Sequence, residues 1–368
     1  MPVQKAKTPR IMISGYYGFD NFGDEAILWV LIREIKRNIR DIDIVVLSKT
    51  PEKTAYNLQV RAIDRMNFFK IVSELTNTNI LVSGGGSLLQ DVTSFLTIYY
   101  YLLIIFLARL FRVECFIYAQ GIGPINRKFS RLATKFILSG IKNVSVRDNK
   151  SQLLLKELNI ESDLTSDPVW LGLKGDCLDV LFEIPEINNN NNVIGVNIRP
   201  WKGISVLDFQ ELALNISHLA RKNGETLLIM PLHYNYDFDI CLNLYNILQT
   251  IAPEQKTVLI DKSLTPPEWE VIISKCQKVI AMRFHALVSS IYLKKELFGI
   301  SYDPKVQTLM ENFNCHYITT QQWQEKKLSE YLKNWYEISN KQLSYNPNYS
   351  HYNDLAGQTI EKLVKIIK

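Results

Sequence analysis

The sequence lacks the features by which zinc, disulfide-stabilised and nucleic-acid-binding proteins are usually identified. Its five cysteines lie far apart, and no two of them form a Cys-x-x-Cys pair. Neither a zinc site nor a disulfide framework is therefore indicated, and we expect a reducing, cytoplasmic compartment. The net charge of +5 comes from 42 basic and 37 acidic residues. This mild excess does not indicate nucleic-acid binding, but it suits an acidic small-molecule substrate or contact with an anionic membrane surface.

The sequence also lacks two common phosphate-binding signatures. Residues 14–25 read SGYYGFDNFGDE, which matches neither the dinucleotide fingerprint G-x-G-x-x-G nor a P-loop. Glycines in this loop allow the backbone to approach a ligand closely. We interpret Asp20 and Asn21 as candidate contacts to sugar hydroxyls. Asp24 and Glu25 are expected to complement the positive end of the helix that follows.

Long hydrophobic segments are scarce. Residues 92–108 (VTSFLTIYYYLLIIFLA) contain no charge and are followed by Arg109, but this length lies at the lower edge of a bilayer span. No second hydrophobic segment accompanies it, and the basic residues 1–7 lead into a strand pattern rather than into a signal-peptide core. We expect a helix in the protein core. A helix at a membrane interface is the alternative, and a membrane span is the least favoured.

What is present indicates an α/β protein with two domains. The chain has 368 residues, of which 47% are apolar and 21% charged, and it is too long for one ordinary core. Short apolar runs alternate with stretches of helical spacing, which is typical of parallel sheets covered on both faces. The predicted strands cover residues 10–14, 43–47, 79–83, 115–119, 143–146, 193–198, 226–230, 257–260, 278–282 and 297–301.

A polar segment near the middle of the chain interrupts the alternating pattern. It contains Pro185 and five consecutive asparagines, Asn188 to Asn192, and is typical of an interdomain linker. We therefore predict two doubly wound, Rossmann-like domains that face each other across a cleft. Their predicted bounds are 1–180 for the first domain, 181–192 for the linker, 193–345 for the second domain and 346–368 for a C-terminal helix.

The clearest functional pattern is a set of basic and titratable residues at predicted strand ends of the second domain. Arg199, Arg283 and Lys305 each follow a strand, and His285 follows Arg283 where a helix begins. Ligands bind at the carboxyl ends of strands in an open α/β sheet, so these side chains are expected to converge. Guanidinium groups and a helix N-terminus favour an anion, and an imidazole transfers protons near neutral pH. The alternative is an arginine in a surface ion pair and a histidine satisfied in the core.

Two loops of the first domain carry further candidates. One glycine-rich loop either binds an anion or polar ligand through backbone N–H groups or forms a tight strand–helix turn without a ligand. It consists of Gly84, Gly85, Gly86 and Ser87. At another strand end Arg147 precedes Asp148. We expect Asp148 to cap the next helix and to pair with Arg147.

Six segments together resemble the polysaccharide pyruvyl transferase family, which includes CsaB-like and WcaK-like enzymes. They read GYYGFDNFGDEAIL, VSGGGSLLQD, YAQGIGP, SVRD, SDPVW and AMRFHALV, and they extend from Gly15 to Val288. The resemblance implies a fold similar to the two-domain GT-B glycosyltransferases. It also implies transfer of the pyruvyl group of phosphoenolpyruvate to two sugar hydroxyls as a cyclic ketal. CsaB-like members act on N-acetylmannosamine in secondary cell-wall polymers, where the ketal anchors surface-layer homology domains.

The chemistry of that donor agrees with the candidate residues. Phosphoenolpyruvate carries a carboxylate and a phosphate, for which Arg199, Arg283 and Lys305 are the expected anion clamp. Addition of a sugar hydroxyl to C2 requires a proton at C3 and loss of the hydroxyl proton, so His285 is the acid–base candidate, with Asp20 and His233 next. Phosphate departure needs positive charge, and nothing in the reaction demands a metal or redox cofactor. We expect the first domain to hold the acceptor and the second to hold phosphoenolpyruvate.

Two other functions are compatible with the same sequence. A GT-B glycosyltransferase would share the fold but would bind a nucleotide sugar. A non-catalytic glycan-binding protein would release no phosphate from phosphoenolpyruvate. A lipid-linked glycan acceptor would place the protein at the inner face of the plasma membrane, in peripheral contact with it.

Overall fold

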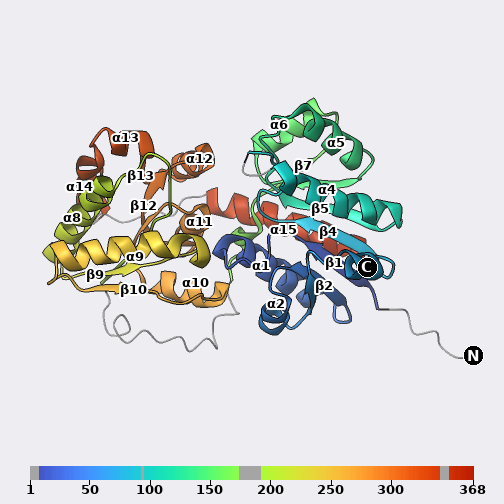
Figure 1. Ribbon diagram of the computed structural model, residues 1–368, viewed down its shortest axis with the longest axis horizontal. Coiled ribbons are helices and arrows are strands. Elements are labelled where there is room, and N and C mark those ends of the chain that lie inside the picture. Colours follow the sequence, from blue (N-terminus) through green and yellow to red (C-terminus); the bar gives the residue numbers. More distant parts are fainter. Residues whose placement is uncertain (1–7, 93–94, 174–191, 340–347) are drawn as a thin grey trace, which may run out of the picture. The chain divides into compact units, whose positions relative to one another are not determined.

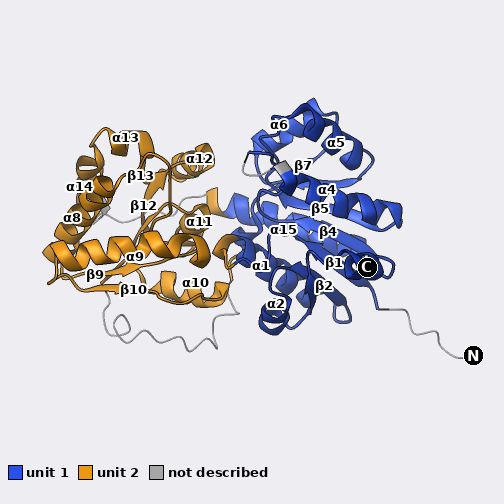
Figure 2. Ribbon diagram, viewed as in Figure 1, with its two compact units in different colours: residues 1–19, 24–171, 350–368 blue, residues 20–23, 172–349 orange. Residues whose placement is uncertain are grey.

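The computed structural model describes residues 8–92, 95–173, 192–339 and 348–368 (Figure 1). The chain divides into two compact units, which are coloured separately in Figure 2. Unit 1 comprises residues 1–19, 24–171 and 350–368, and unit 2 comprises residues 20–23 and 172–349. Each unit contains a parallel sheet with alternating helices, so the predicted α/β class is confirmed.

In the described residues, unit 1 contains a seven-stranded sheet in the order β3-β2-β1-β4-β5-β6-β7. The strands are β1 (Arg10–Ser14), β2 (Asp43–Ser48), β3 (Arg61–Asp64), β4 (Ile80–Gly84), β5 (Glu114–Gln120), β6 (Asn143–Val146) and β7 (Asp163–Leu164). The helical elements are α1 (Phe22–Asn38), α2 (Pro51–Leu58), α3 (Phe68–Leu75), α4 (Phe95–Leu110), α5 (Lys128–Leu138), α6 (Asn149–Glu157), η1 (Pro168–Leu171) and α15 (Asn348–Ile367). The strand order reverses between β1 and β4, and ligands of doubly wound sheets bind at such a reversal.

Helices cover both faces of this sheet because the side chains of a strand alternate between the faces. Ile11 and Ile13 of β1 pack in one core cluster with residues of α1 and α15. Met12, between them, packs in a second cluster with residues of α4 and α5. All three side chains have no solvent exposure. Burial on both faces explains why β1 is an uninterrupted apolar run.

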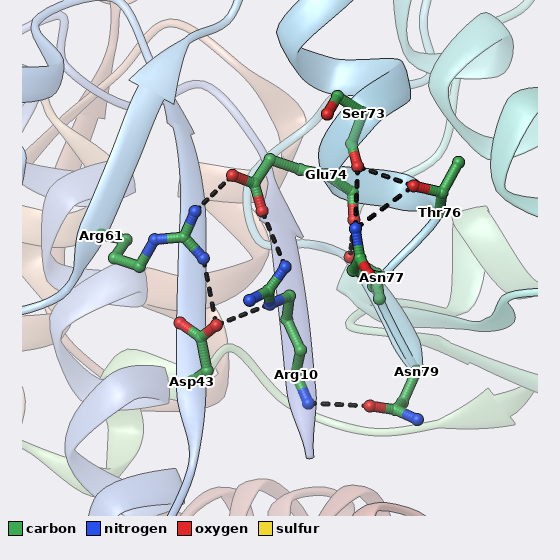
Figure 3. A network of polar contacts seen from close by, with 9 residues as sticks. Arg10, Asp43, Arg61, Ser73, Glu74, Thr76, Asn77 and Asn79 are labelled. Carbon is green, nitrogen blue, oxygen red and sulfur yellow. Dashed lines mark hydrogen bonds and ion pairs between the residues drawn. The ribbon is translucent and has the colours of Figure 1, made fainter. Parts of the chain in front are cut away.

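The amino ends of the unit 1 strands carry a closed network of ion pairs (Figure 3). Arg10 Nε contacts Asp43 Oδ2 at 2.5 Å, and Arg10 Nη1 contacts Glu74 Oε2 at 3.1 Å. Arg61 pairs with the same two carboxylates. Each charge is compensated within the network, and partly exposed pairs of this kind contribute about 0.2–1 kcal/mol each. The network therefore joins β1, β2, β3 and α3 at the amino edge of the sheet.

In the described residues, unit 2 contains a six-stranded sheet in the order β10-β9-β8-β11-β12-β13. The strands are β8 (Val193–Asn197), β9 (Thr226–Ile229), β10 (Thr257–Leu259), β11 (Lys278–Ala281), β12 (Glu296–Ser301) and β13 (His316–Thr319). The helices are α8 (Val206–Lys222), α9 (Tyr234–Ile251), α10 (Pro266–Lys275), α11 (Phe284–Tyr292), α12 (Pro304–Asn312), α13 (Thr320–Gln324) and α14 (Leu328–Ser339). Here the order reverses between β8 and β11, whose following loops begin with Ile198 and Met282.

The observed units differ from the predicted domain bounds. Residues 20–23 group with unit 2, the main change of unit falls after Leu171, and residues 350–368 group with unit 1. The last difference has a clear cause, because Leu363 of α15 packs in the same core cluster as β1. Thr165 Oγ1 also donates a hydrogen bond to Leu355 O at 2.9 Å. The predicted linker, 181–192, lies outside the described residues except for Asn192.

Helix α4 contains most of the uncharged segment discussed above. Ile98, Leu102 and Ile105 are buried in the core of unit 1, as expected of a core helix. Leu103 and Phe106, however, are 43% and 40% exposed, so only one side of the helix is in the core. Within the described residues, no helix combines the length and the apolar character needed to cross a membrane.

Candidate active site

The carboxyl ends of three neighbouring strands in unit 2 are joined by one buried amide. Asn197, at the end of β8, has no solvent exposure. Its Nδ2 donates to Met230 O after β9 at 2.9 Å, and its Oδ1 accepts from the backbone N–H of Arg283 after β11 at 3.0 Å. These bonds fix the positions at which the β9 and β11 loops leave the sheet. Sequence analysis missed Asn197, although a polar residue closing the apolar run VIGVN was a visible signal.

Arg283 forms a two-pronged ion pair with Asp237 of α9. Its Nε lies 2.8 Å from Asp237 Oδ2 and its Nη2 lies 2.5 Å from Oδ1, and the Asp237 side chain has no exposure. Burial lowers the pKa of Arg283, but the hydrogen bonds and charge of Asp237 outweigh it, so the net pKa is raised and the guanidinium remains charged. The structure thus places Arg283 in an ion pair, as the alternative interpretation held, but the pair is buried rather than superficial. Asp237 was not among the candidate residues predicted from the sequence.

The Arg199 guanidinium lies against aromatic rings instead of a carboxylate. Its Cζ is 4.5 Å from the Tyr302 ring centroid and 5.5 Å from that of Tyr236. Its Nη1 donates to the Tyr302 hydroxyl at 2.9 Å. Among the described residues, Arg199 forms no ion pair, and its buried Nε has no hydrogen-bond partner. A buried donor on an uncompensated cation favours an anionic ligand.

One aromatic ring connects the two arginines. The Tyr236 ring centroid lies 5.5 Å from Arg199 Cζ and 5.6 Å from Arg283 Cζ. Both guanidinium groups therefore lie beside the same ring, and their loops follow β8 and β11, the strands between which the order reverses. Tyr236 and Tyr302 were not singled out beforehand, because aromatic residues near loops are common.

His285 lies in the first turn of α11 and packs against the backbone of Gly23. A Cβ atom added to Gly23 would lie 2.0 Å from His285 Nδ1. The imidazole also contacts the Phe284 ring edge-to-face, with centroids 5.3 Å apart. The side chain is partly exposed, so it is not a fully buried core histidine.

Residues 20–23 reach this position by pairing with the segment after β9. Phe22 N donates to Leu232 O at 2.8 Å, and Tyr234 N donates to Asp20 O at 3.1 Å. Asn21 forms an antiparallel bridge with His233. The candidates Asp20, Asn21, His233 and His285 are therefore joined through one backbone segment of unit 2. Asp20 adopts a positive φ of 56° in this turn, a conformation that aspartate tolerates better than most residues.

We expect substitution of Gly23 by alanine to displace the His285 imidazole. The new methyl group has no room beside the ring, and overpacking of this kind typically costs about 1–3 kcal/mol. NMR of the imidazole nitrogens should show the displacement, and thermal unfolding should show the loss of stability. Gly357→Ala is the control, because a Cβ there meets nothing within 4 Å. An unchanged His285 spectrum in Gly23→Ala would contradict the packing described here.

Lys305 is more exposed than Arg283 and has a carboxylate of its own loop nearby. It occupies the first turn of α12, and its Nζ lies 3.9 Å from the Asp303 carboxylate with 41% of the side chain exposed. Its convergence with Arg199 and Arg283 stays a prediction.

The glycine-rich loop of unit 1 is tightly packed. Gly85 and Gly86 have φ values of 75° and 71°, and an added Cβ would lie 2.2 Å from Ile27 and 2.3 Å from Asp24, respectively. Gly85 N donates to Tyr118 O at 3.1 Å. Close packing alone explains these glycines. Ligand binding by Gly84–Ser87 stays a prediction.

A second buried ion pair lies beside this loop. Arg147 Nη1 contacts Asp167 Oδ2 at 2.6 Å, and Arg147 Nη2 donates to Ser87 Oγ at 2.9 Å. Asp148 accepts from Ser151 N at 2.8 Å, so its predicted capping role is confirmed. The predicted Arg147–Asp148 pair was wrong, because β6 and η1 place Asp167 closer to the guanidinium. Asp167 belongs to the SDPVW segment noted in the sequence.

Comparison with known proteins identifies the family. The family model described as polysaccharide pyruvyl transferase matches residues 21–304. The chain belongs to the polysaccharide pyruvyl transferase family. The matched region includes the described site residues from Asn21 to Arg283. Because the family is one of transferases, this protein is a transferase that acts on a sugar or glycan acceptor.

Solved structures with the same fold carry related names. UDP-GlcNAc 2-epimerase of Methanocaldococcus jannaschii aligns over 98% of this chain and 100% of its own, with 10% identity and a TM-score of 0.67. The Neisseria meningitidis UDP-GlcNAc 2-epimerase bound to UDP-GlcNAc aligns over 97% of this chain and 100% of its own, with 14% identity and a TM-score of 0.62. A Rickettsia africae glycosyltransferase aligns over 99% of this chain and 98% of its own, with 14% identity and a TM-score of 0.58. These identities show the fold alone, which is the GT-B type. A comparison with curated proteins found no match.

Proposed function

We propose that this family member transfers the pyruvyl group of phosphoenolpyruvate to two hydroxyls of a sugar, forming a cyclic ketal and releasing phosphate. The main support for this proposal is the environment of the Arg199 side chain. Its guanidinium has a buried, unpartnered Nε and no counter-ion among the described residues. A donor with both a carboxylate and a phosphate supplies the missing charge and hydrogen-bond acceptor.

The other cations are proposed to act differently from Arg199. Asp237 already holds Arg283 by two hydrogen bonds, so Arg283 presents its remaining donors in a fixed orientation rather than as a fully free charge. Lys305 is exposed and is proposed to contact the phosphate from the solvent side. Positive charge at these positions stabilises the phosphate as it leaves.

His285 is the proposed acid–base group. In the first step one sugar oxygen bonds to C2 of phosphoenolpyruvate, its proton leaves, and C3 receives a proton to become a methyl group. In the second step another sugar oxygen bonds to C2 while the bond from C2 to the phosphate oxygen breaks. The second hydroxyl proton leaves with the phosphate. Asp20 and His233 lie on the paired segment that also holds Gly23 and are the next candidates for these transfers.

Acceptor recognition and location complete the proposal. Asp20 and Asn21 are proposed to contact sugar hydroxyls, and Gly84–Ser87 with unit 1 is the proposed acceptor side. The acceptor class is a glycan precursor, with N-acetylmannosamine on a lipid-linked cell-wall polymer as the specific candidate. We propose that the reaction takes place in the cytoplasm, at the inner face of the plasma membrane, with no cofactor beyond the donor substrate.

Mass spectrometry of sugar acceptors tests the reaction directly. Incubation with phosphoenolpyruvate should add the mass of pyruvate less one water to an accepted sugar, with matching phosphate release. Thermal unfolding with phosphoenolpyruvate or UDP-GlcNAc as ligand separates the proposal from a nucleotide-sugar glycosyltransferase. Stabilisation by UDP-GlcNAc alone would support the glycosyltransferase. Absence of phosphate release across varied acceptors would favour a glycan-binding protein.

Substitution of Arg199 should weaken donor binding selectively. We expect Arg199→Ala to raise the KM for phosphoenolpyruvate by about 10- to 100-fold, because a hydrogen-bonded charge contact is lost. Arg199→Lys should recover only part of this loss, since an ammonium cannot reproduce the planar guanidinium contacts. Lys202→Ala, an exposed basic residue of the same loop, is the control. Equal losses for donor and acceptor would contradict a specific donor contact.

A further inference from the structure

Two helices of unit 1 expose apolar side chains in regular stripes. On α4 the exposed positions recur every three or four residues, at Leu96, Tyr99, Leu103, Phe106 and Leu110. On α5 they are Phe129, Leu132 and Phe136. Phe129 is 81% exposed and Phe136 is 70% exposed, values that are unusual for phenylalanine in a folded protein. We call these two stripes together the α4–α5 face.

Helices α4 and α5, which carry these stripes, contact each other near both of their ends. Near the start of both helices, the Tyr99 hydroxyl lies 3.4 Å from Ser130 Oγ. At their ends, Arg109 Nη1 donates to Ile137 O at 2.6 Å. The opposite sides of α4 and α5 already supply Ile98, Leu102 and Leu138 to the core. The exposed stripes are therefore additional to the apolar surface needed for folding.

Most charged residues of α4, α5 and the loops beside them are basic. Between residues 95 and 142 the only acidic residue is Glu114. The basic residues of this stretch are Arg109, Arg112, Arg127, Lys128, Arg131, Lys135 and Lys142. Arg131 pairs with Glu157, whereas Arg112, Lys128 and Lys135 form no ion pair with a described residue. An apolar stripe with a basic rim is typical of helices that lie at an anionic lipid surface.

We propose that the α4–α5 face docks onto an anionic lipid bilayer, with Phe129 and Phe136 inserted among the headgroups and the lysines and arginines at the lipid phosphates. A second copy of the chain is the less suitable occupant, because it would bring two basic rims together. The inference specifies the surface for the peripheral contact proposed above. It does not depend on the donor, since its test measures lipid binding without turnover.

Vesicle flotation with the full chain tests the proposal. Vesicles of phosphatidylcholine alone are compared with vesicles that also contain phosphatidylglycerol. We expect binding to the anionic vesicles to be stronger by about 10-fold or more and to fall with added salt. Phe129→Ser with Phe136→Ser should reduce it by a similar factor, and so should Lys128→Glu with Lys135→Glu. The matched control is Tyr56→Ser with Leu153→Ser, two exposed apolar residues of unit 1 outside this face.

The possible outcomes distinguish a lipid bilayer from a second copy of the chain as the partner of this face. Thermal unfolding verifies that the variants fold, which is expected because all the substituted side chains are exposed or partly exposed. Equal flotation of the wild type and the double phenylalanine variant would overturn the proposal, as would no flotation with either vesicle. A wild-type dimer that the phenylalanine variant converts to a monomer, without lipid binding, would identify the face as an interface between copies. Loss of pyruvyl transfer with retained lipid binding would refute only the proposed function.

Discussion

Replacement of Asp237 by alanine should lower the free energy of unfolding by about 3–5 kcal/mol, because it leaves a buried arginine without its counter-ion. The Arg283 guanidinium is 14% exposed and has Asp237 as its ion-pair partner. Asp237 Oδ2 also accepts a hydrogen bond from His233 N at 3.1 Å, so the substitution removes a contact at the start of α9 as well. Denaturation in urea, monitored by tryptophan fluorescence, measures the change.

Two further variants distinguish the ion pair from general disruption. Asp239→Asn is the control, because Asp239 is exposed on the same helix two residues later. The double variant Asp237→Leu with Arg283→Met removes both charges and should be more stable than Asp237→Ala, since no unpaired charge remains buried. If Asp237→Asn is as stable as Asp239→Asn, Arg283 does not depend on Asp237 for its charge compensation.

Replacement of His285 by alanine should lower the turnover number by ~100-fold or more while preserving the fold. The ring is partly exposed, and its removal leaves space beside Gly23 instead of a clash. Affinity for phosphoenolpyruvate should change little, because the proposed anion contacts belong to Arg199 and Arg283. Steady-state kinetics of phosphate release separate the turnover number from KM.

The glutamine variant decides whether His285 transfers protons or only positions a substrate. His285→Gln should remain as slow as His285→Ala, because an amide forms hydrogen bonds but does not titrate near neutral pH. His218→Ala, an exposed histidine of α8, should retain wild-type kinetics. Near wild-type turnover in His285→Gln would move the acid–base role to Asp20 or His233.

The sequence predicted the central strands of both sheets more reliably than the edges. β1, β8 and β11 are uninterrupted apolar runs because helices cover both of their faces. β3 and β13 were missed, since edge strands are short and partly exposed and their side chains show no continuous apolar run.

The sequence by itself determined the fold class, the family and the positions of Arg199, Arg283 and His285 at strand ends. These features depend on the local period of strands and helices and on short motifs, which are readable along the chain. Only the tertiary structure decided which side chains contact these residues. Asp237 meets Arg283 across 46 residues, and the segment containing Gly23 meets His285, because strand order and loop paths bring distant segments together. It also decided which side of α4 remains exposed, since an evenly apolar helix carries no local signal of the side that the core will cover.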